Sequence, residues 1–487
     1  MAHELVVRHG TVVTAAGAAR ADVGVDGGRI TALGEGLPPG RRELDAAGLY
    51  VLPGGIDSHC HLEQVSSAGV MCADDFYSGT VAAAFGGTTT VVPFAAQHRG
   101  MKLRPVVHDY HRRAAEKAVV DYAFHLIVAD ASEEALREDL PRLVAEGVTS
   151  LKVYMTYDRL RLGDEELLDV LAAARRLGAL TMIHAENHGM IAWLSSRLLH
   201  AGATAPRYHA ISHPRVAEGE AVQRAIALAE LVDTPILIVH VSDAAGVAAI
   251  RHAQARGLRV YGETCPQYLF LTANDLDRPG LEGAKYGCSP PPRDAAAQAA
   301  IWAGLADGTF QAYSSDHAPY RFDTSGKLPK GERTTFKDMA NGVPGIELRL
   351  PLLFSEGVQT GRLSLSEFVA LGATNHARLY GLYPRKGTIA IGSDADLALW
   401  DPGRRVRVSA SMLHDQVGYT PYEGRELTGW PVTVLSRGRI VVQDGQLLVE
   451  RGSGRFLPCA PAEWARPRDV AVPELRRLRE LGPTFEL

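Results

Sequence analysis

Several side chains of the types that bind divalent metal ions lie beside short apolar runs. His59 and His61 are separated by one residue, and on an extended chain both point to the same side. His184 and His240 each follow an apolar run, and Asp316 ends another. Imidazoles together with a carboxylate suit zinc and similar ions. Taken singly, each has an ordinary alternative, such as a turn or core histidine or an N-cap aspartate. A metal site therefore requires a fold that brings them together.

Lys152 lies within the apolar run SLKVYM (150–155). Burying an ammonium ion there would be costly. One interpretation is a lysine that reaches solvent or pairs with an acid. The other is a neutral amine that has reacted with carbon dioxide to form a carbamate, which is a bidentate anion able to bridge two metal ions. The residue types are compatible with both interpretations.

The order of apolar runs and amphipathic segments in the middle of the chain predicts parallel βα units. The expected strands are 50–57, 88–94, 122–128, 150–155, 180–185, 235–241, 259–265 and 310–316. Eight such units over about 270 residues predict one (β/α)₈ TIM-type barrel, whose active site forms at the C-terminal ends of the strands. The metal-binding side chains would then meet at one rim. An open, doubly wound sheet is the alternative, and the absence of a GxGxxG turn after the first strand argues against it.

The two ends of the chain have a different pattern, with short strands separated by Gly and Asp turns. We expect 1–50 and 385–450 to form one small composite β-sandwich beside a barrel at 51–384. The remaining tail, 451–487, is rich in Arg, Pro and Glu and is a candidate for contact with a neighbouring subunit.

The bulk composition is that of a soluble enzyme, with 46% hydrophobic and 22% charged residues. A net charge of −5 gives no reason to expect a nucleic-acid partner. No long apolar stretch predicts a signal peptide or a membrane span. Five cysteines without a CxxC pair favour reduced thiols, and hence a cytoplasmic location.

Motifs along the chain carry a family resemblance. They are HCH (59–61), SLKVYMTY (150–157), HAEN (184–187), HVS (240–242), GETCPQYLFL (262–271), CSPPPR (288–293), SSDHAP (314–319) and NGVPGIE (341–347). In this order they resemble the hydantoinase/dihydropyrimidinase branch of the amidohydrolase superfamily, from about residue 5 to 450. The resemblance implies a binuclear zinc enzyme that hydrolyses the ring amide of dihydropyrimidines or 5-substituted hydantoins to N-carbamoyl amino acids.

The resemblance also assigns roles to the metal-binding side chains. His59, His61 and Asp316 would bind the more buried zinc ion, and His184 and His240 the second. Lys152, as N6-carboxylysine, would bridge the two ions. A hydroxide shared by the ions would attack the ring carbonyl. Asp316 would take its proton and pass it to the departing ring nitrogen.

Other roles implied by the resemblance concern the substrate and the assembly. Tyr157 would donate a hydrogen bond to the oxyanion, and its alternative is an ordinary packed loop aromatic. The backbone groups of Ser289 and Asn341 would hold the amide edge of the ring. Relatives on this scaffold form homo-oligomers, so a homotetramer or dimer is expected.

The identity of the ring is left open by the sequence. Allantoinase, cyclic imidase and dihydroorotase-like activities are the alternatives. Glu63, where an arginine would clamp a substrate carboxylate, argues against dihydroorotate by its charge. His98 and Arg99 are candidates for contact with a polar ring substituent, and SDHAP followed by ELRLPLLF (347–354) resembles the allantoinase side. A non-catalytic scaffold is the remaining alternative, and the intact set of ligands argues against it.

Overall fold

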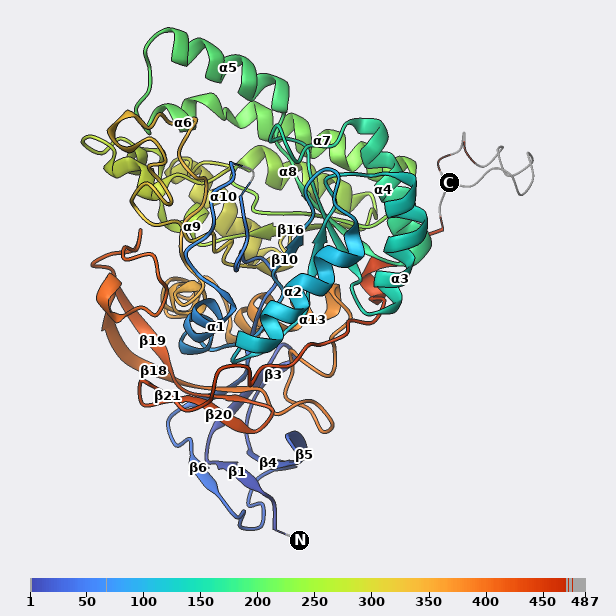
Figure 1. The fold of residues 1–487 in the computed structure, drawn as a ribbon. Coiled ribbons are helices and arrows are strands. Elements are labelled where there is room, and N and C mark those ends of the chain that lie inside the picture. Colours follow the sequence, from blue (N-terminus) through green and yellow to red (C-terminus); the bar gives the residue numbers. More distant parts are fainter. Residues whose placement is uncertain (1, 67, 470–471, 473–474, 476–487) are drawn as a thin grey trace.

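A barrel of parallel strands forms the centre of the protein, as the sequence predicts. Helices surround it (Figure 1). The computed structural model describes residues 2–66, 68–469, 472 and 475. In chain order the barrel strands are β8 (Gly55–Asp57), β9 (Thr88–Val91) continued by β10 (Phe94–Ala96), β11 (Asp121–Tyr122) continued by β12 (His125–Ile127), β13 (Ser150–Tyr154), β14 (Leu180–His184), β15 (Ile236–Ile238), β16 (Val260–Thr264) and β17 (Ala312–Tyr313). Every pairing among them is parallel.

The barrel closes between its last and first strands. A parallel bridge joins Cys60 to His317, and the N–H of His61 donates to the carbonyl oxygen of His317 at 2.7 Å. The N–H of Ser315 also donates to Oδ1 of Asp57 at 3.1 Å. The segments that carry His61 and Asp316 are therefore fixed side by side.

Helices alternate with the strands and cover the outside of the barrel. They are α1 (Phe76–Phe85), α2 (Leu103–Lys117), α3 (Leu140–Ala145), α4 (Asp164–Leu177), α5 (His188–His200), α6 (Tyr208–Ser212), α7 (Arg215–Leu231), α8 (Ala244–Ala255), α9 (Gln267–Phe270), α10 (Ala295–Ala306), α11 (Arg349–Leu353), α12 (Leu365–Val369) and α13 (Asn375–Leu379). The strands are buried on both faces, since β14 and β15 have no exposed residue. Helix α4 shows the local rules, with acidic residues in its first turn and Gly178 in the left-handed conformation after its last.

Both ends of the chain build the smaller β-domain, at the opposite end of the molecule from α5 (Figure 1). One sheet has the order β5-β4-β1-β6 and the other β21-β20-β19-β18-β7-β2-β3. Their strands are β1 (Leu5–Arg8), β2 (Thr11–Thr14), β3 (Gly17–Arg20), β4 (Asp22–Asp26), β5 (Arg29–Gly34), β6 (Glu43–Asp45), β7 (Tyr50–Pro53), β18 (Leu397–Arg407), β19 (Glu426–Ser436), β20 (Arg439–Gln443) and β21 (Gln446–Leu447). Val7, Val23, Leu397 and Leu435 belong to the apolar cluster between the sheets.

One expected strand is divided between the two domains. Tyr50–Pro53 pairs with β18 and β2 in the β-domain, and Gly55–Asp57 alone enters the barrel. Gly54 marks the change because a Cβ there would lie 2.2 Å from Oγ1 of Thr89. Apolar runs on either side of a buried glycine read as one strand in the sequence, although they belong to different sheets.

The first part of the C-terminal tail packs against its own chain. The N–H of Tyr122 donates to Arg455, the N–H of Leu457 donates to Tyr122, and the N–H of Cys459 donates to Gly147, at 2.9, 2.7 and 2.9 Å. This red segment passes along the barrel toward α3 in Figure 1. Residues 451–469 are thus an intramolecular strap, and most of 470–487 lies outside the described residues.

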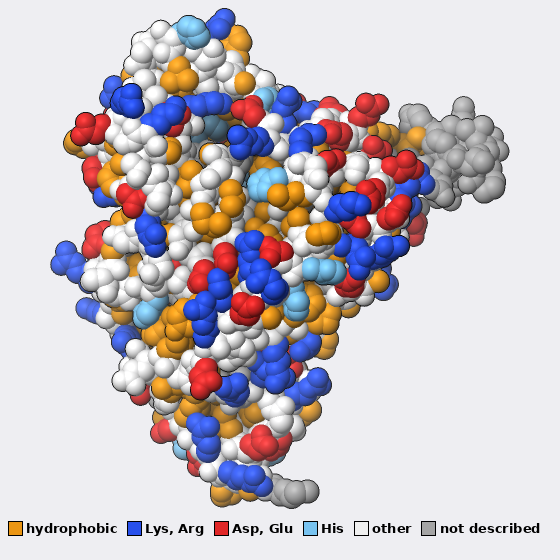
Figure 2. Space-filling view, in the orientation of Figure 1, with side chains coloured by type: hydrophobic (Ala, Val, Ile, Leu, Met, Phe, Trp, Pro, Cys, Tyr) orange, Lys and Arg blue, Asp and Glu red, His pale blue; other side chains and the backbone are white. Residues whose placement is uncertain are grey.

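Basic and acidic side chains are interspersed over the face drawn in Figure 2. Among the described residues, no helix combines the length and the apolar character that a membrane crossing needs.

Candidate metal centre and active site

A pocket of about 350 Å³ opens at the C-terminal ends of the barrel strands. The residues to which the family resemblance assigns metal-binding, catalytic or ring-binding roles all line it: His59, His61, Lys152, Tyr157, His184, His240, Ser289, Asp316 and Asn341. The barrel therefore brings these residues together from seven separate motifs, as the position of active sites in this fold requires.

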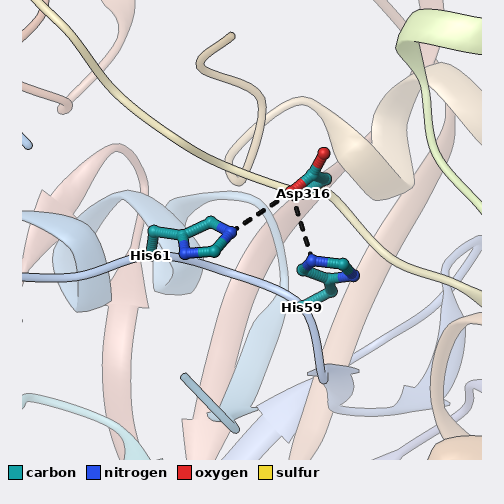
Figure 3. A group of neighbouring side chains, drawn as sticks. All are labelled: His59, His61 and Asp316. Carbon is teal, nitrogen blue, oxygen red and sulfur yellow. Dashed lines mark ion pairs between the residues drawn. The ribbon is translucent and has the colours of Figure 1, made fainter. Parts of the chain in front are cut away.

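His59, His61 and Asp316 converge in the first group (Figure 3). Oδ1 of Asp316 lies 3.2 Å from Nε2 of His59 and 3.4 Å from Nε2 of His61. The candidate ligand atoms all lie within 4.8 Å of one another. Two imidazole nitrogens and a carboxylate oxygen around one point are a donor set that suits zinc.

His184 and His240 form a second group beside the first. Their ring centroids are 4.4 Å apart, and the His240 ring lies 5.5 Å from that of His59. Nδ1 of His240 is buried without a hydrogen-bond partner among the described residues. An unsatisfied buried nitrogen is costly unless something else binds it, so this atom fits a metal ligand.

Lys152 lies between the two groups. It is fully buried, and its Nζ is 3.4 Å from Nε2 of His59. Its Nζ forms no salt bridge with a carboxylate of the described residues, although Glu263 and Asp316 are near enough to oppose the lowering of its pKa. Burial lowers the pKa of Lys152 to about 8, which makes the neutral amine accessible near neutral pH.

The electrostatics of the pocket favour metal binding over protonation. Burial lowers the pKa values of His59, His184 and His240, which favours the neutral imidazole that can bind a metal ion. Burial opposes ionisation of Asp316, but His59 and His61 outweigh it and hold the pKa of Asp316 below its usual range. The aspartate is therefore an anion in the folded protein.

Buried carboxylates and an amide orient the histidines, and the sequence analysis did not predict these partners. Nδ1 of His59 lies 2.6 Å from Glu263, Nε2 of His184 lies 2.7 Å from Glu186, and Nδ1 of His61 lies 2.9 Å from Gln64. Such partners fix the tautomer and direction of a ligating imidazole. Glu263 could have been found, because it lies at the end of the seventh barrel strand within GETCPQ.

Strained backbone marks the same residues. Tyr157, His240 and Asp316 have φ values of 71°, 42° and 46°. This left-handed region costs a non-glycine residue about 1–3 kcal/mol and is concentrated at functional sites. The fold thus holds three site residues in conformations that they would not choose freely.

Tyr157, Ser289 and Asn341 lie on loops around the same pocket. The ring of Tyr157 is 5.1 Å from that of His184. Ser289 is buried, and its Oγ lies 3.3 Å from Nε2 of His209, a residue that the sequence reading did not consider. Nε2 of His209 also lies 2.8 Å from the carbonyl oxygen of Cys288.

Two expectations about the substrate were wrong. Glu63 does not line the pocket; its carboxylate lies 2.7 Å from Nζ of Lys117 on α2, so its charge says nothing about dihydroorotate. Arg99 turns outward to the carbonyl oxygen of Arg161, at 2.9 Å, and His98 does not line the pocket. Glu63 was assigned to the pocket because it closely follows the HCH motif, and His98 and Arg99 because their loop follows an expected barrel strand.

Comparison with known proteins agrees with the fold and the site. The model of the amidohydrolase family matches residues 50–441. A D-hydantoinase of Ralstonia pickettii is 44% identical over 93% of this chain and 98% of its own length. The crystal structure of a dihydropyrimidinase from Brevibacillus agri NCHU1002 superposes with a TM-score of 0.92 at 45% identity, covering 95% of this chain and 99% of that one.

An L-hydantoinase from Arthrobacter aurescens is a more distant relative. It is 30% identical, with a TM-score of 0.84 over 94% of this chain and 100% of its own. Near full-length similarity at these identities covers the barrel, the β-domain and all the motifs of the pocket. The chain therefore belongs to the amidohydrolase family, in its hydantoinase/dihydropyrimidinase branch.

Proposed function

We propose that this protein is a binuclear metal hydrolase that opens the ring amide of 5-substituted hydantoins and dihydropyrimidines, releasing N-carbamoyl amino acids. The observation that carries the proposal is the convergence of four histidines, Lys152 and Asp316 on one pocket at the barrel rim. The relatives named D-hydantoinase and dihydropyrimidinase support the substrate class. Relatives named D-hydantoinase or D-phenylhydantoinase are 44%, 40% and 46% identical to this chain, and the L-hydantoinase is 30% identical, so we propose preference for D-5-substituted hydantoins.

Membership of the family implies a divalent metal at a group such as His59, His61 and Asp316. We propose two zinc ions. His59, His61 and Asp316 would hold one, His184 and His240 the other, and Lys152 as N6-carboxylysine would contact both. The orphaned Nδ1 of His240 and the full burial of Lys152, which forms no salt bridge among the described residues, support this assignment. Bound in this way, the ions would make water nucleophilic near neutral pH and polarise the scissile carbonyl.

The chain's own groups would manage protons and hold the ring. Asp316 is an anion at the pocket floor, so it would accept a proton and later deliver it to the leaving ring nitrogen. The hydroxyl of Tyr157 would donate to the oxygen that gains negative charge. Backbone groups of Ser289 and Asn341 would hold the amide edge of the ring.

The pocket also has room and apolar surface for a substituent. Leu160, Ile191, Phe336 and Met339 line it together with the polar residues. Apolar side chains favour an alkyl or aromatic group at the 5-position over an unsubstituted ring.

Two features support proposals about the setting of the enzyme. Trp193 on α5, Ile211 on α6 and Val216 on α7 are 55%, 52% and 61% exposed, which favours contact between copies in a homotetramer or dimer. Light scattering after size-exclusion chromatography tests this.

All five cysteines are free and buried, and this supports a reducing, cytoplasmic location.

A metal analysis and a ring-opening panel test the function together. We expect about two divalent ions per chain in protein prepared without chelators. The panel holds both enantiomers of a 5-substituted hydantoin, hydantoin, dihydrouracil, succinimide, allantoin and dihydroorotate. Fastest turnover of the D-hydantoin supports the proposal. Turnover of dihydroorotate or allantoin without hydantoin, or metal-free protein, would overturn it.

A further inference from the structure

Lys327 is a second fully buried lysine that the proposed mechanism does not use. It lies on the long loop after β17 and has no carboxylate oxygen within 4 Å of its Nζ among the described residues. Burial of a lysine without a counter-charge is expensive unless its donors are all satisfied. The position of this lysine therefore requires an explanation.

Three backbone carbonyl oxygens surround the Nζ of Lys327. They belong to Gly287, Ala340 and Gly342, at 2.8, 2.7 and 2.5 Å. An ammonium group has three N–H donors and no acceptor, so this arrangement uses all of them. The N–H of Gly342 also donates to the carbonyl oxygen of Gly287 at 2.9 Å, which ties the same two segments directly.

These carbonyls flank the residues proposed to hold the substrate. Ala340 and Gly342 lie on either side of Asn341, and Gly287 lies two residues before Ser289. The chain segments around both residues line the pocket. One buried side chain thus joins the two loops that would form the binding edge for the ring.

The direction of the Asn341 N–H follows from the same contact. The peptide between Ala340 and Asn341 is not among the cis bonds, so its C=O and N–H point in opposite directions. Because Lys327 binds the oxygen of Ala340, the N–H of Asn341 points away from Nζ. No hydrogen bond from this N–H to another described residue is present. The donor is therefore available to a ligand in the pocket.

We propose that Lys327 is a positioning residue that aims the backbone N–H of Asn341 into the pocket and so fixes the edge that binds the ring amide. The inference rests on the proposed function for the identity of the ligand. The three contacts of Lys327 with backbone carbonyls do not depend on that function. Lys327 touches neither the candidate metal ligands nor Tyr157, so its effect should fall on binding of the ring.

The test compares Lys327→Met with wild type and with Lys102→Met, an exposed lysine on the outside of the barrel that pairs with Glu134. We expect the KM of Lys327→Met for its hydantoin substrate to rise about 10-fold or more, since buried carbonyls lose their donors and the edge loosens. The kcat should change little, because an edge that binds ground state and transition state equally affects KM alone. Metal content should stay at the wild-type value, and Lys102→Met should match wild type in every respect.

Hydrogen exchange supplies a readout independent of activity. In Lys327→Met the amide of Gly342 should exchange faster, as should peptides covering 285–291 and 338–344, while the barrel strands keep their protection. Lys327→Gln, which keeps two donors, should give intermediate values.

The outcomes separate the two proposals. If wild type opens no cyclic amide, the proposed function fails. Hydrogen exchange would then still test whether Lys327 fixes the backbone around Asn341. Unchanged KM and exchange in an active Lys327→Met enzyme would overturn the positioning role. A fall in kcat, metal content and global stability together, or failure of both variants to fold, would also overturn it, because Lys327 would then serve the core only.

Discussion

Nδ1 of His59 lies 2.6 Å from Oε1 of Glu263, and both side chains are buried. The second oxygen of Glu263 accepts a hydrogen bond from Ser314 at 2.8 Å. The carboxylate thus fixes the tautomer that leaves Nε2 of His59 facing Asp316. A ligand whose direction is set in this way binds metal without first paying to reorganise.

Glu263→Gln tests this relationship, since it keeps the shape of the side chain and replaces its carboxyl group with an amide. We expect metal affinity to fall about 10–100-fold, as for other partners of ligating histidines. Competition with a chelator of known affinity measures it. Glu282→Gln, on the surface helix η3 (Glu282–Tyr286), is the control and should leave affinity unchanged. Wild-type affinity in Glu263→Gln would show that His59 needs no carboxylate partner.

The barrel and the position of the site residues at its rim could be predicted, because both depend on local pattern. Apolar runs fix the strands, and His184 or Asp316 at the end of a run is enough to place it at the rim. The partners of these residues could not be predicted in the same way. The contact of His59 with Glu263 joins residues 204 positions apart, and no periodicity reports such a pair.

The errors have a related cause. Glu63 follows the HCH motif closely, yet its φ of 50° marks a turn, and its carboxylate points to Lys117 on α2. Sequence proximity therefore indicated the wrong side of the loop. Tyr50–Pro53 joins the larger sheet of the β-domain, because its partner strand β18 comes from the C-terminal part of the chain. In both cases the position of the residues is set by a partner distant in the sequence, which the local pattern does not show.

Lys152→Ala should abolish ring opening, because it removes the group proposed to contact both metal ions. A short carboxylic acid added to the variant should restore part of the activity by filling the space with a carboxylate. The measurement is turnover against acetate or propionate concentration, with metal content determined in parallel. Wild type treated with the same acids is the control and should gain nothing. An active, metal-replete Lys152→Ala enzyme without added acid would contradict the bridging role.

Tyr157→Phe removes the proposed donor to the developing oxyanion and retains the ring. Loss of one such donor costs about 100–1000-fold in kcat, so kcat should fall by that factor with metal content unchanged. Tyr154→Phe is the matched control, since its ring lies 5.7 Å from that of Tyr157 and lines the same pocket. Its kcat should fall far less. Equal losses in the two variants would argue that Tyr157 contributes packing alone.

Two buried histidines beneath the pocket predict how stability depends on pH. Nε2 of His125 lies 2.8 Å from the carbonyl oxygen of Ser58, and Nε2 of His376 lies 2.8 Å from that of Leu371. Their Nδ1 atoms lie 2.6 Å from Oγ of Ser150 and 2.8 Å from Oγ of Ser58. Each ring therefore donates at Nε2 and accepts at Nδ1, which is the neutral form. Burial lowers the pKa of each to about 3.

Because the unfolded chain has the higher pKa, it binds protons that the folded protein does not bind. The stability that neutral His125 and His376 contribute is complete above about pH 6.5 and falls as the pH drops toward 3. Each histidine should add up to about 1.4 kcal/mol per pH unit to the loss of unfolding free energy in that window. Urea unfolding of metal-free protein between pH 7 and 5 measures the slope of unfolding free energy against pH. His376→Gln should reduce this slope by up to the equivalent of one bound proton, about 1.4 kcal/mol per pH unit. A variant at residue 376 with the wild-type slope would mean that His376 is already protonated in the folded protein.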